Sequence, residues 1–188
     1  ANEMAKHSHQ MREMNIGKSH AIITPCYSSE NRGYIPACLI DKNTTITNLC
    51  FGIFDGPIWN LSILFSKLHF IWIDTVCGHM GTGLRYSNTM GWNTFPLPKL
   101  TEKNRLDLER SAKNILLARE SHFPASIADL YEKNNMPENL RMAHNDNDEV
   151  LERIYIGRKF KNDTERLEKL FDLYTKMTTT LNTTLRAQ

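Results

Sequence analysis

The sequence predicts an α+β fold, in which a mixed α/β first half with a small antiparallel sheet is followed by a helical bundle. Short β-branched runs between polar turns occupy residues 20–51, whereas apolar residues recur at helical spacing after Pro98. The Pro-Leu-Pro run at residues 96–98 separates the two patterns. We therefore expect domains at residues 1–98 and 99–188. The start at Ala1, without an initiator methionine, is consistent with an N-terminally truncated piece of a longer protein and equally with processing or a cloning scar.

The composition is compatible with many classes of globular protein. The chain is 40% hydrophobic and 23% charged, which is ordinary for a globular protein, and its net charge of +2 gives no global field that favours nucleic acid. The four cysteines form no C-x-x-C pair, so a zinc site is not expected and buried thiols are. Because no secretory signal opens the chain, we expect a cytoplasmic protein without disulfides.

The first half begins with a rough helical spacing over residues 1–15 and then predicts strands over residues 20–27, 34–40 and 44–51. The polar turn after the first strand contains Ser28, Ser29 and Arg32. These side chains suit a phosphate, through two hydroxyls and a guanidinium, but they equally suit the capping of a turn, which is the commoner role.

A helix is expected over residues 57–77, where apolar residues recur every three or four positions. Pro57 suits its first turn and Gly78 its end. Polar residues, Lys67 and Asp74 among them, interrupt the segment, and a membrane span of about 20 residues tolerates such groups poorly. The sequence therefore favours a buried helix over a membrane span.

Residues 81–88 are expected to be extended. Side chains alternate between the faces of a strand, so Gly81, Gly83 and Arg85 would line one face while Leu84 and Tyr86 pack on the other. Because glycine weakens a strand unless something approaches closely, this face is a candidate for contact with a partner.

Four helices are predicted in the second half. The first runs from a cap at Thr101 to about Glu120, and the others start near Ser126, Pro137 and Asp163, with a frayed tail from residue 178 onward. His144 and Asp148 lie one turn apart and suit either a catalytic pair or a structural hydrogen bond. The structural role is favoured, because no nucleophile or metal ligand accompanies them.

The motifs of common catalytic classes are missing from the sequence. We find no glycine fingerprint for a dinucleotide or a methyl donor, no Gly-x-Ser-x-Gly, no His-Glu-x-x-His and no acidic cluster of the kind that nucleases use for magnesium. No catalytic or metal-binding residue is therefore assigned, and this chain by itself does not resemble a catalytic domain.

An ordered set of motifs resembles one family over residues 18–177. The set comprises Ser28-Ser29-Glu30-Asn31-Arg32, Ser66-Lys67-Leu68-His69-Phe70-x-Trp72, Val76-Cys77-Gly78, Arg85-Tyr86-Ser87-Asn88, Asn93-x-Phe95-Pro96-x-Pro98 and Leu140-Arg141-x-Ala143-His144. Together they are similar to the C-terminal third of the MmeI-like bifunctional restriction–modification enzymes. That part consists of a target recognition domain followed by a C-terminal helical domain.

The resemblance implies a longer polypeptide with a nuclease region and an adenine methyltransferase domain upstream. It implies no cofactor in this chain, with S-adenosylmethionine, and magnesium for cleavage, used elsewhere in the parent enzyme. The expected partners are double-stranded DNA and the upstream methyltransferase domain, with no membrane. The chain would hold the duplex while the target adenine is flipped into that domain.

Candidate DNA contacts follow from the same resemblance. In this family the segment between the Cys-Gly and Arg-Tyr-Ser motifs varies and carries base-recognising side chains. Arg85 would pair with a guanine edge, and phosphate contacts would come from Lys67, Arg32 and the serines. The full candidate set is Ser28, Ser29, Arg32, Lys67, His69, Gly81, Thr82, Gly83, Arg85, Ser87 and Asn88.

Two alternatives remain. The chain could be a protein-interaction or scaffold module without direct DNA contact, which predicts an exposed apolar patch on its helices. It could also be a stand-alone enzyme, which the lack of a catalytic cluster makes the least favoured of the three hypotheses.

Overall fold

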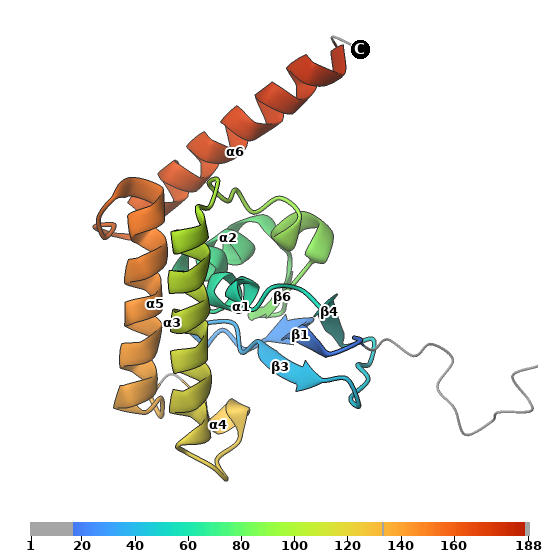
Figure 1. The fold of residues 1–188 in the computed structure, drawn as a ribbon, viewed down its shortest axis with the longest axis vertical. Helices are drawn as coiled ribbons and strands as arrows, with labels where there is room; N and C mark the ends of the chain where they lie inside the picture. Colours follow the sequence, from blue (N-terminus) through green and yellow to red (C-terminus); the bar gives the residue numbers. More distant parts are fainter. Residues whose placement is uncertain (1–16, 133, 187–188) are drawn as a thin grey trace, which may run out of the picture.

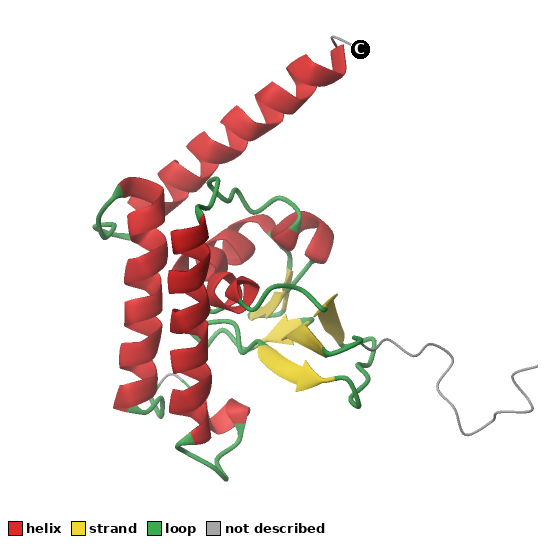
Figure 2. Cartoon of the chain, viewed as in Figure 1, coloured by secondary structure: helices red, strands yellow, loops and turns green. Residues whose placement is uncertain are grey.

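The computed structural model describes the chain from residue 17 to residue 186 except residue 133, with side chains described up to residue 179. Two small antiparallel sheets and two helices form the first half, and four further helices follow (Figures 1 and 2). The predicted α+β class is therefore confirmed. The helix expected over residues 1–15 lies outside the described residues.

The first sheet has the strand order β3-β1-β4, with β1 at His20–Pro25, β3 at Cys38–Asp41 and β4 at Cys50–Phe54. Both neighbours run antiparallel to β1. The strand expected over residues 44–51 is wrong in position, since only its last two residues belong to β4. The Asp41 carboxylate accepts hydrogen bonds from the Asn43 amide and the Thr44 hydroxyl, and a turn and loop precede β4 there.

The second sheet has the order β2-β6-β5 and is built from very short strands: β2 at Tyr27–Ser28, β5 at His79–Met80 and β6 at Gly83–Arg85. The single strand expected over residues 20–27 is thus divided at Cys26 between two sheets. β5 and β6 form a hairpin whose turn contains Gly81 and Thr82. A short π-helical turn, η2, follows at Asn88–Trp92.

The helix expected over residues 57–77 is wrong in its continuity. The structure has α1 at Trp59–Leu64 and α2 at Lys67–Val76, with a break at Phe65 and Ser66. The Ser66 hydroxyl accepts a hydrogen bond from the His69 amide at 3.1 Å and donates one to the Ile63 carbonyl at 2.7 Å. One serine therefore caps the start of α2 and ties it to the end of α1.

The helices of the second half begin close to where the sequence predicts. They are α3 at Glu102–Glu120, α4 at Ile127–Leu130, α5 at Glu138–Ile156 and α6 at Asp163–Arg186. Thr101 and Ser126 form capping boxes at the first two. α6 continues as helix beyond Thr178, and the fraying expected from that residue stays a prediction. α3 and α5 lie side by side while α6 projects away from the body (Figure 1).

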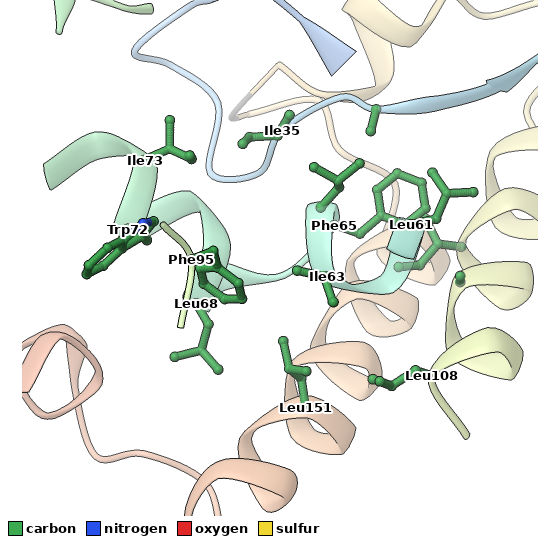
Figure 3. Packing of buried hydrophobic residues seen from close by; sticks show 14 of the residues in the cluster. Ile35, Leu61, Ile63, Phe65, Leu68, Trp72, Ile73, Phe95, Leu108 and Leu151 are labelled. Carbon is green, nitrogen blue, oxygen red and sulfur yellow. The ribbon is translucent and has the colours of Figure 1, made fainter. Parts of the chain in front are cut away.

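Both halves of the chain contribute to one apolar core. α1 and α2 pack between the sheets and the α3–α5 pair, and Leu61, Phe65, Leu108 and Leu151 meet in the same cluster (Figure 3). No helix in the described part of the chain is long and apolar enough to cross a membrane. The shared core gives the second sheet a rigid support.

Candidate nucleic-acid interface

Arg85 lies on β6 beside a groove of about 530 Å³, which we call the Arg85 groove. The backbone around it is fixed on two sides, because the Arg85 amide donates to the Gly78 carbonyl at 3.0 Å and the Tyr86 amide to the Cys26 carbonyl at 2.8 Å. The residues that line the groove are Cys26, Tyr27, Asn48, Leu49, Phe51, Gly78, Arg85, Tyr86, Ser87 and Met90.

The alternation expected for this strand explains why the arginine points outward. Leu84 and Tyr86 are only 4% and 5% exposed and anchor the strand in the core, while Arg85 between them is exposed. Its guanidinium has no hydrogen-bond or ion-pair partner among the described residues. A fixed backbone thus presents an unpaired guanidinium, which is what recognition of a base edge requires.

The two glycines before Arg85 have different roles. Gly83 faces β2, and a Cβ there would lie 3.0 Å from the Ser28 carbonyl oxygen. Gly81 belongs to the hairpin turn rather than to the strand, with φ of +62°, and its surroundings are open. The expected row of three residues is therefore shortened to Gly83 and Arg85, and Thr82 is exposed in the turn.

The opposite wall of the Arg85 groove was not foreseen. It comes from Asn48 and Leu49, in the loop before β4, whereas Tyr27 on β2 is the direct strand partner of Arg85 and lies beside it. The Cys26 amide donates to the Leu49 carbonyl at 2.8 Å and so holds this loop against β2. The sequence predicts a strand over residues 44–51, and that prediction hides Asn48 as a loop residue of the groove. The adjacent polar residues Thr47 and Asn48 are the signal for a loop, and the Thr47 hydroxyl accepts from the Leu49 amide at 3.3 Å.

His69 lies beneath the groove rather than on its surface. It is fully buried, and its Nε2 lies 3.0 Å from the Tyr86 hydroxyl. Trp92 and Phe95 pack edge-on against the imidazole. Burial lowers the pKa of His69 to about 3, which keeps the ring neutral. The prediction that His69 contacts DNA is wrong; the residue instead holds Tyr86, the neighbour of Arg85.

The predicted phosphate site at Ser28, Ser29 and Arg32 forms a turn. The Ser29 carbonyl accepts from the Arg32 amide at 3.2 Å, and its hydroxyl accepts from the Asn31 amide at 3.2 Å. The Ser28 hydroxyl and the Arg32 Nε are buried without a hydrogen-bond partner in the described part of the chain. None of the three residues lines the Arg85 groove, and their contact with phosphate stays a prediction.

Of the remaining predicted DNA contacts, one lines the Arg85 groove and two do not. They are Ser87, which lines it, and Lys67 and Asn88, which do not. Lys67 begins α2, with its Nζ 5.0 Å from the centre of the Phe70 ring, and it lies outside the groove. Ser87 lines the groove and caps η2 by accepting from the Met90 amide at 3.2 Å. Asn88 is exposed on η2. Their contacts with DNA stay predictions.

His144 and Asp148 do not form a pair with each other. The His144 Nε2 lies 2.6 Å from the Tyr131 hydroxyl and its Nδ1 lies 3.0 Å from the Phe65 carbonyl oxygen. Asp148 accepts from the Lys67 amide at 2.6 Å and from the Tyr34 hydroxyl at 2.9 Å. Both side chains bind the first half of the chain, so the structural interpretation fits this geometry.

Asn147, between them on α5, completes the same contact. It accepts from the Ser62 hydroxyl at 2.5 Å and donates to the Ser62 carbonyl at 2.9 Å. We call His144, Asn147 and Asp148 the α5 clamp. It holds the residues on both sides of the α1–α2 break, and α2 leads directly into the β5–β6 hairpin.

The described residues offer no cluster of three or more His, Cys, Asp or Glu side chains that would hold a metal ion. The four cysteines are free thiols, with Cys26 and Cys77 buried and Cys38 and Cys50 half-buried. Burial raises the pKa of each thiol, which disfavours the reactive thiolate.

Comparison with known proteins identifies two family matches that follow one another along the chain. The family described as "MmeI, target recognition domain" matches residues 1–99, and "MmeI, C-terminal domain" matches residues 100–182. A curated relative, DNA methyltransferase A of Bacillus subtilis strain 168, is 37% identical over 177 residues, which are 94% of this chain and 20% of that protein.

A solved structure shares the fold. It is the type IIL restriction-modification enzyme MmeI in complex with DNA, with a TM-score of 0.86 and 29% sequence identity over 95% of this chain. The match covers 24% of the MmeI chain. The present chain thus spans between a fifth and a quarter of the length of these two relatives.

Proposed function

Since this chain belongs to the MmeI family, through the target recognition and C-terminal domains of that family, we propose that it recognises the DNA sequence on behalf of a longer site-specific DNA methyltransferase. The observation that carries the proposal is Arg85, an exposed and unpaired guanidinium fixed on β6 at the edge of a groove. Its setting matches the role that base recognition assigns to arginine.

The chemistry of the Arg85 groove suits the major-groove edges of bases. A guanidinium donates two parallel hydrogen bonds to the N7 and O6 atoms of guanine, and such a pair contributes about 1–3 kcal/mol of discrimination against other bases. Asn48 on the opposite wall carries an amide, the group that pairs with the N6 and N7 atoms of adenine. The groove therefore offers two neighbouring base contacts of different preference.

The backbone of the groove is positioned from below. Tyr86 is anchored through its hydroxyl by the buried His69, and α2, which carries His69, is held at its first residue by Asp148. A base contact loses specificity when its side chain can shift, so a supporting shell of buried hydrogen bonds contributes to selectivity. In this proposal the helical domain braces the recognition domain.

Affinity would come from other residues. Lys67, Arg32 and Ser29 are assigned to phosphate contacts, which position the duplex without distinguishing sequences and weaken as salt is added, whereas the Ser28 hydroxyl is buried. Thr82, exposed in the hairpin turn, and Asn88, exposed on η2, complete the proposed surface.

The remaining functions belong to the parent polypeptide. We propose that its upstream part binds S-adenosylmethionine, methylates adenine and, where a nuclease region is present, cleaves DNA with magnesium, in the cytoplasm. The boundary between the recognition and helical domains is placed at residues 98 and 99. Because the two parts share one core, they would move together on the DNA.

The proposal is tested in the intact parent by measuring binding to its own site and to scrambled DNA. Arg85→Ala should weaken binding to the specific site about tenfold or more and leave scrambled DNA unaffected, because a base contact is lost. Lys67→Ala should weaken both by the same factor and reduce the slope of binding against salt concentration by about one.

A fall in both affinities for Arg85→Ala, or a fall in neither, would contradict the assignment of Arg85 to a base. The matched control is Arg110→Ala, which removes an exposed guanidinium from α3, far along the chain from the hairpin. It should change neither affinity.

A second candidate function is supported by exposed apolar side chains in the helical half. Leu117, Met142 and Phe123 are all exposed, and Phe123 is 88% exposed. These residues suit contact with another protein surface. If this were the main function, Leu117→Glu and Phe123→Glu would abolish an association of the parent while Arg85→Ala would leave its DNA affinities unchanged.

A further inference from the structure

A second, smaller cavity of about 260 Å³ adjoins the Arg85 groove, and Phe51 and Tyr86 line both. Trp92 adds a third aromatic ring to this cavity, and Asn88 and Asn93 contribute two amides. Phe51 and Tyr86 contact each other, with ring centres 5.9 Å apart, and so form one continuous aromatic wall. The cavity lies between the first sheet and η2, away from the backbone contacts that form the hairpin.

Its lining has a distinct chemistry. No lysine, arginine, aspartate or glutamate lines the cavity, so it is unsuited to a phosphate or to any other charged group. Thr24, however, is one of the lining residues and is only 5% exposed, and its buried hydroxyl has no hydrogen-bond partner among the described residues. Burying a hydroxyl without a hydrogen-bond partner destabilises the protein, and a ligand whose polar edge hydrogen-bonds to that hydroxyl removes this cost.

These features together fit a flat, uncharged heterocycle. Aromatic rings stack on such a ligand, and amides and a hydroxyl offer both donors and acceptors to its edge. The volume lies just under the range of about 300–1,000 Å³ that drug-sized ligands occupy, so the cavity accommodates one or two rings. A nucleobase has this size and this chemistry.

Resting on the proposed function, we propose that the cavity receives the base left unpaired in the opposite strand when the parent enzyme rotates its target adenine out of the duplex. That base is a thymine, and it has already lost its pairing partner, which makes it the least costly base to displace. Its oxygens accept from the Thr24 hydroxyl and from amide N–H groups, and its methyl group suits the apolar residues Ile22 and Leu64 of the cavity.

Continuity with the Arg85 groove supports this occupant over a free heterocycle. Phe51 and Tyr86 belong to the linings of both the groove and the cavity, so a base displaced from a duplex in the groove would have only a short way to the cavity. Binding the unpaired thymine would stabilise the state in which the adenine is out of the stack, and would therefore speed methylation rather than select the sequence.

The test uses the full-length parent and two duplexes that carry its own site, one with thymine and one with an abasic nucleotide opposite the target adenine. Thr24→Val removes the hydroxyl with little change of shape, and Asn93→Leu removes an amide of similar size. Each variant should methylate the thymine duplex about tenfold more slowly than the wild-type enzyme does. On the abasic duplex, each variant should be as fast as the wild-type enzyme is on that duplex, because no unpaired base is present to bind in the cavity. Asn114→Leu, at an exposed position on α3, should change neither rate.

The outcomes separate the two proposals. If the wild-type parent methylates neither duplex, the proposed function fails. If it methylates both, and the variants slow both duplexes equally or slow neither, the cavity does not bind the unpaired base and this inference is overturned.

Discussion

The Arg85 groove and the α5 clamp differ in whether their polar side chains are exposed and whether they are hydrogen-bonded. In the groove, the Arg85 guanidinium is exposed and has no partner among the described residues. In the clamp, His144 and Asn147 are fully buried, and each hydrogen-bonds to both a side chain and a backbone carbonyl. An exposed, unpaired polar group thus lies on a support whose own buried polar groups are hydrogen-bonded.

This difference suggests a division of labour between the domains. The groove is built from strands of two to six residues and their loops, which are weakly held by themselves. The clamp comes from a helix of 19 residues in the other half. Mutations in the clamp should therefore affect stability first, and mutations in the groove should affect recognition without affecting stability.

The largest expected effect is the loss of stability in Asn147→Leu. The leucine leaves both the hydroxyl and the carbonyl of Ser62 buried without a partner, and each unsatisfied group costs about 1–3 kcal/mol. We expect the free energy of unfolding, measured by urea denaturation, to fall by about 3 kcal/mol. Asn145→Leu, at an exposed position on the same helix, should change it by less than about 0.5 kcal/mol. Equal effects of the two variants would show that the hydrogen bonds of Asn147 do not stabilise the fold.

The next effect is the response of stability to pH. Burial lowers the pKa of His69 and of His144 to about 3, and it raises the pKa of Asp148 to about 7. Between about pH 6 and pH 4 the unfolded chain therefore carries close to two protons on these histidines, whereas the folded chain carries about one, on Asp148.

The unfolded state then binds one more proton, so the free energy of unfolding should fall by about 1.4 kcal/mol for each pH unit of acidification in that window. Asp148→Asn removes the opposing proton, and the slope should steepen to about 2.7 kcal/mol per pH unit. Urea denaturation at several pH values measures both slopes. A stability that is flat or rising on acidification would show that the two imidazoles are not buried in neutral form.

A smaller effect is expected in the hairpin turn. Gly81 has φ of +62°, so Gly81→Ala should cost about 1 kcal/mol through backbone strain, even though the space around it is open. Gly78→Ala is the matched control, since that position is equally open and its φ is not in the left-handed region. It should be close to neutral. If both substitutions had the same effect, the turn would not have the conformation described.

Local signals predicted the helical half well. Thr101 and Ser126 cap α3 and α4, and Pro137 directly precedes α5. Each is a contact within a few residues, which a sequence displays directly. The alternation of Leu84, Arg85 and Tyr86 likewise predicted which side chain is exposed.

Features that depend on distant contacts were missed. The break between α1 and α2 rests on Ser66 and on α5 residues about 80 positions later, so an apolar periodicity that runs through residues 57–77 gives no sign of it. His69 resembled a surface contact because its partners, Tyr86 and Phe95, come from later segments. Asn48 was missed because a β-branched run hid the loop that carries it.

We propose that Arg85 recognises one base pair of the target site. The most direct measurement is the sequence motif methylated in cells that express the full-length parent, wild type or Arg85→Ala, determined by sequencing that detects methylated adenine. The account predicts that one position of the motif becomes degenerate in the variant while the other positions and the methylated base stay the same. An unchanged motif, or an equal loss of methylation at all sites, would contradict it.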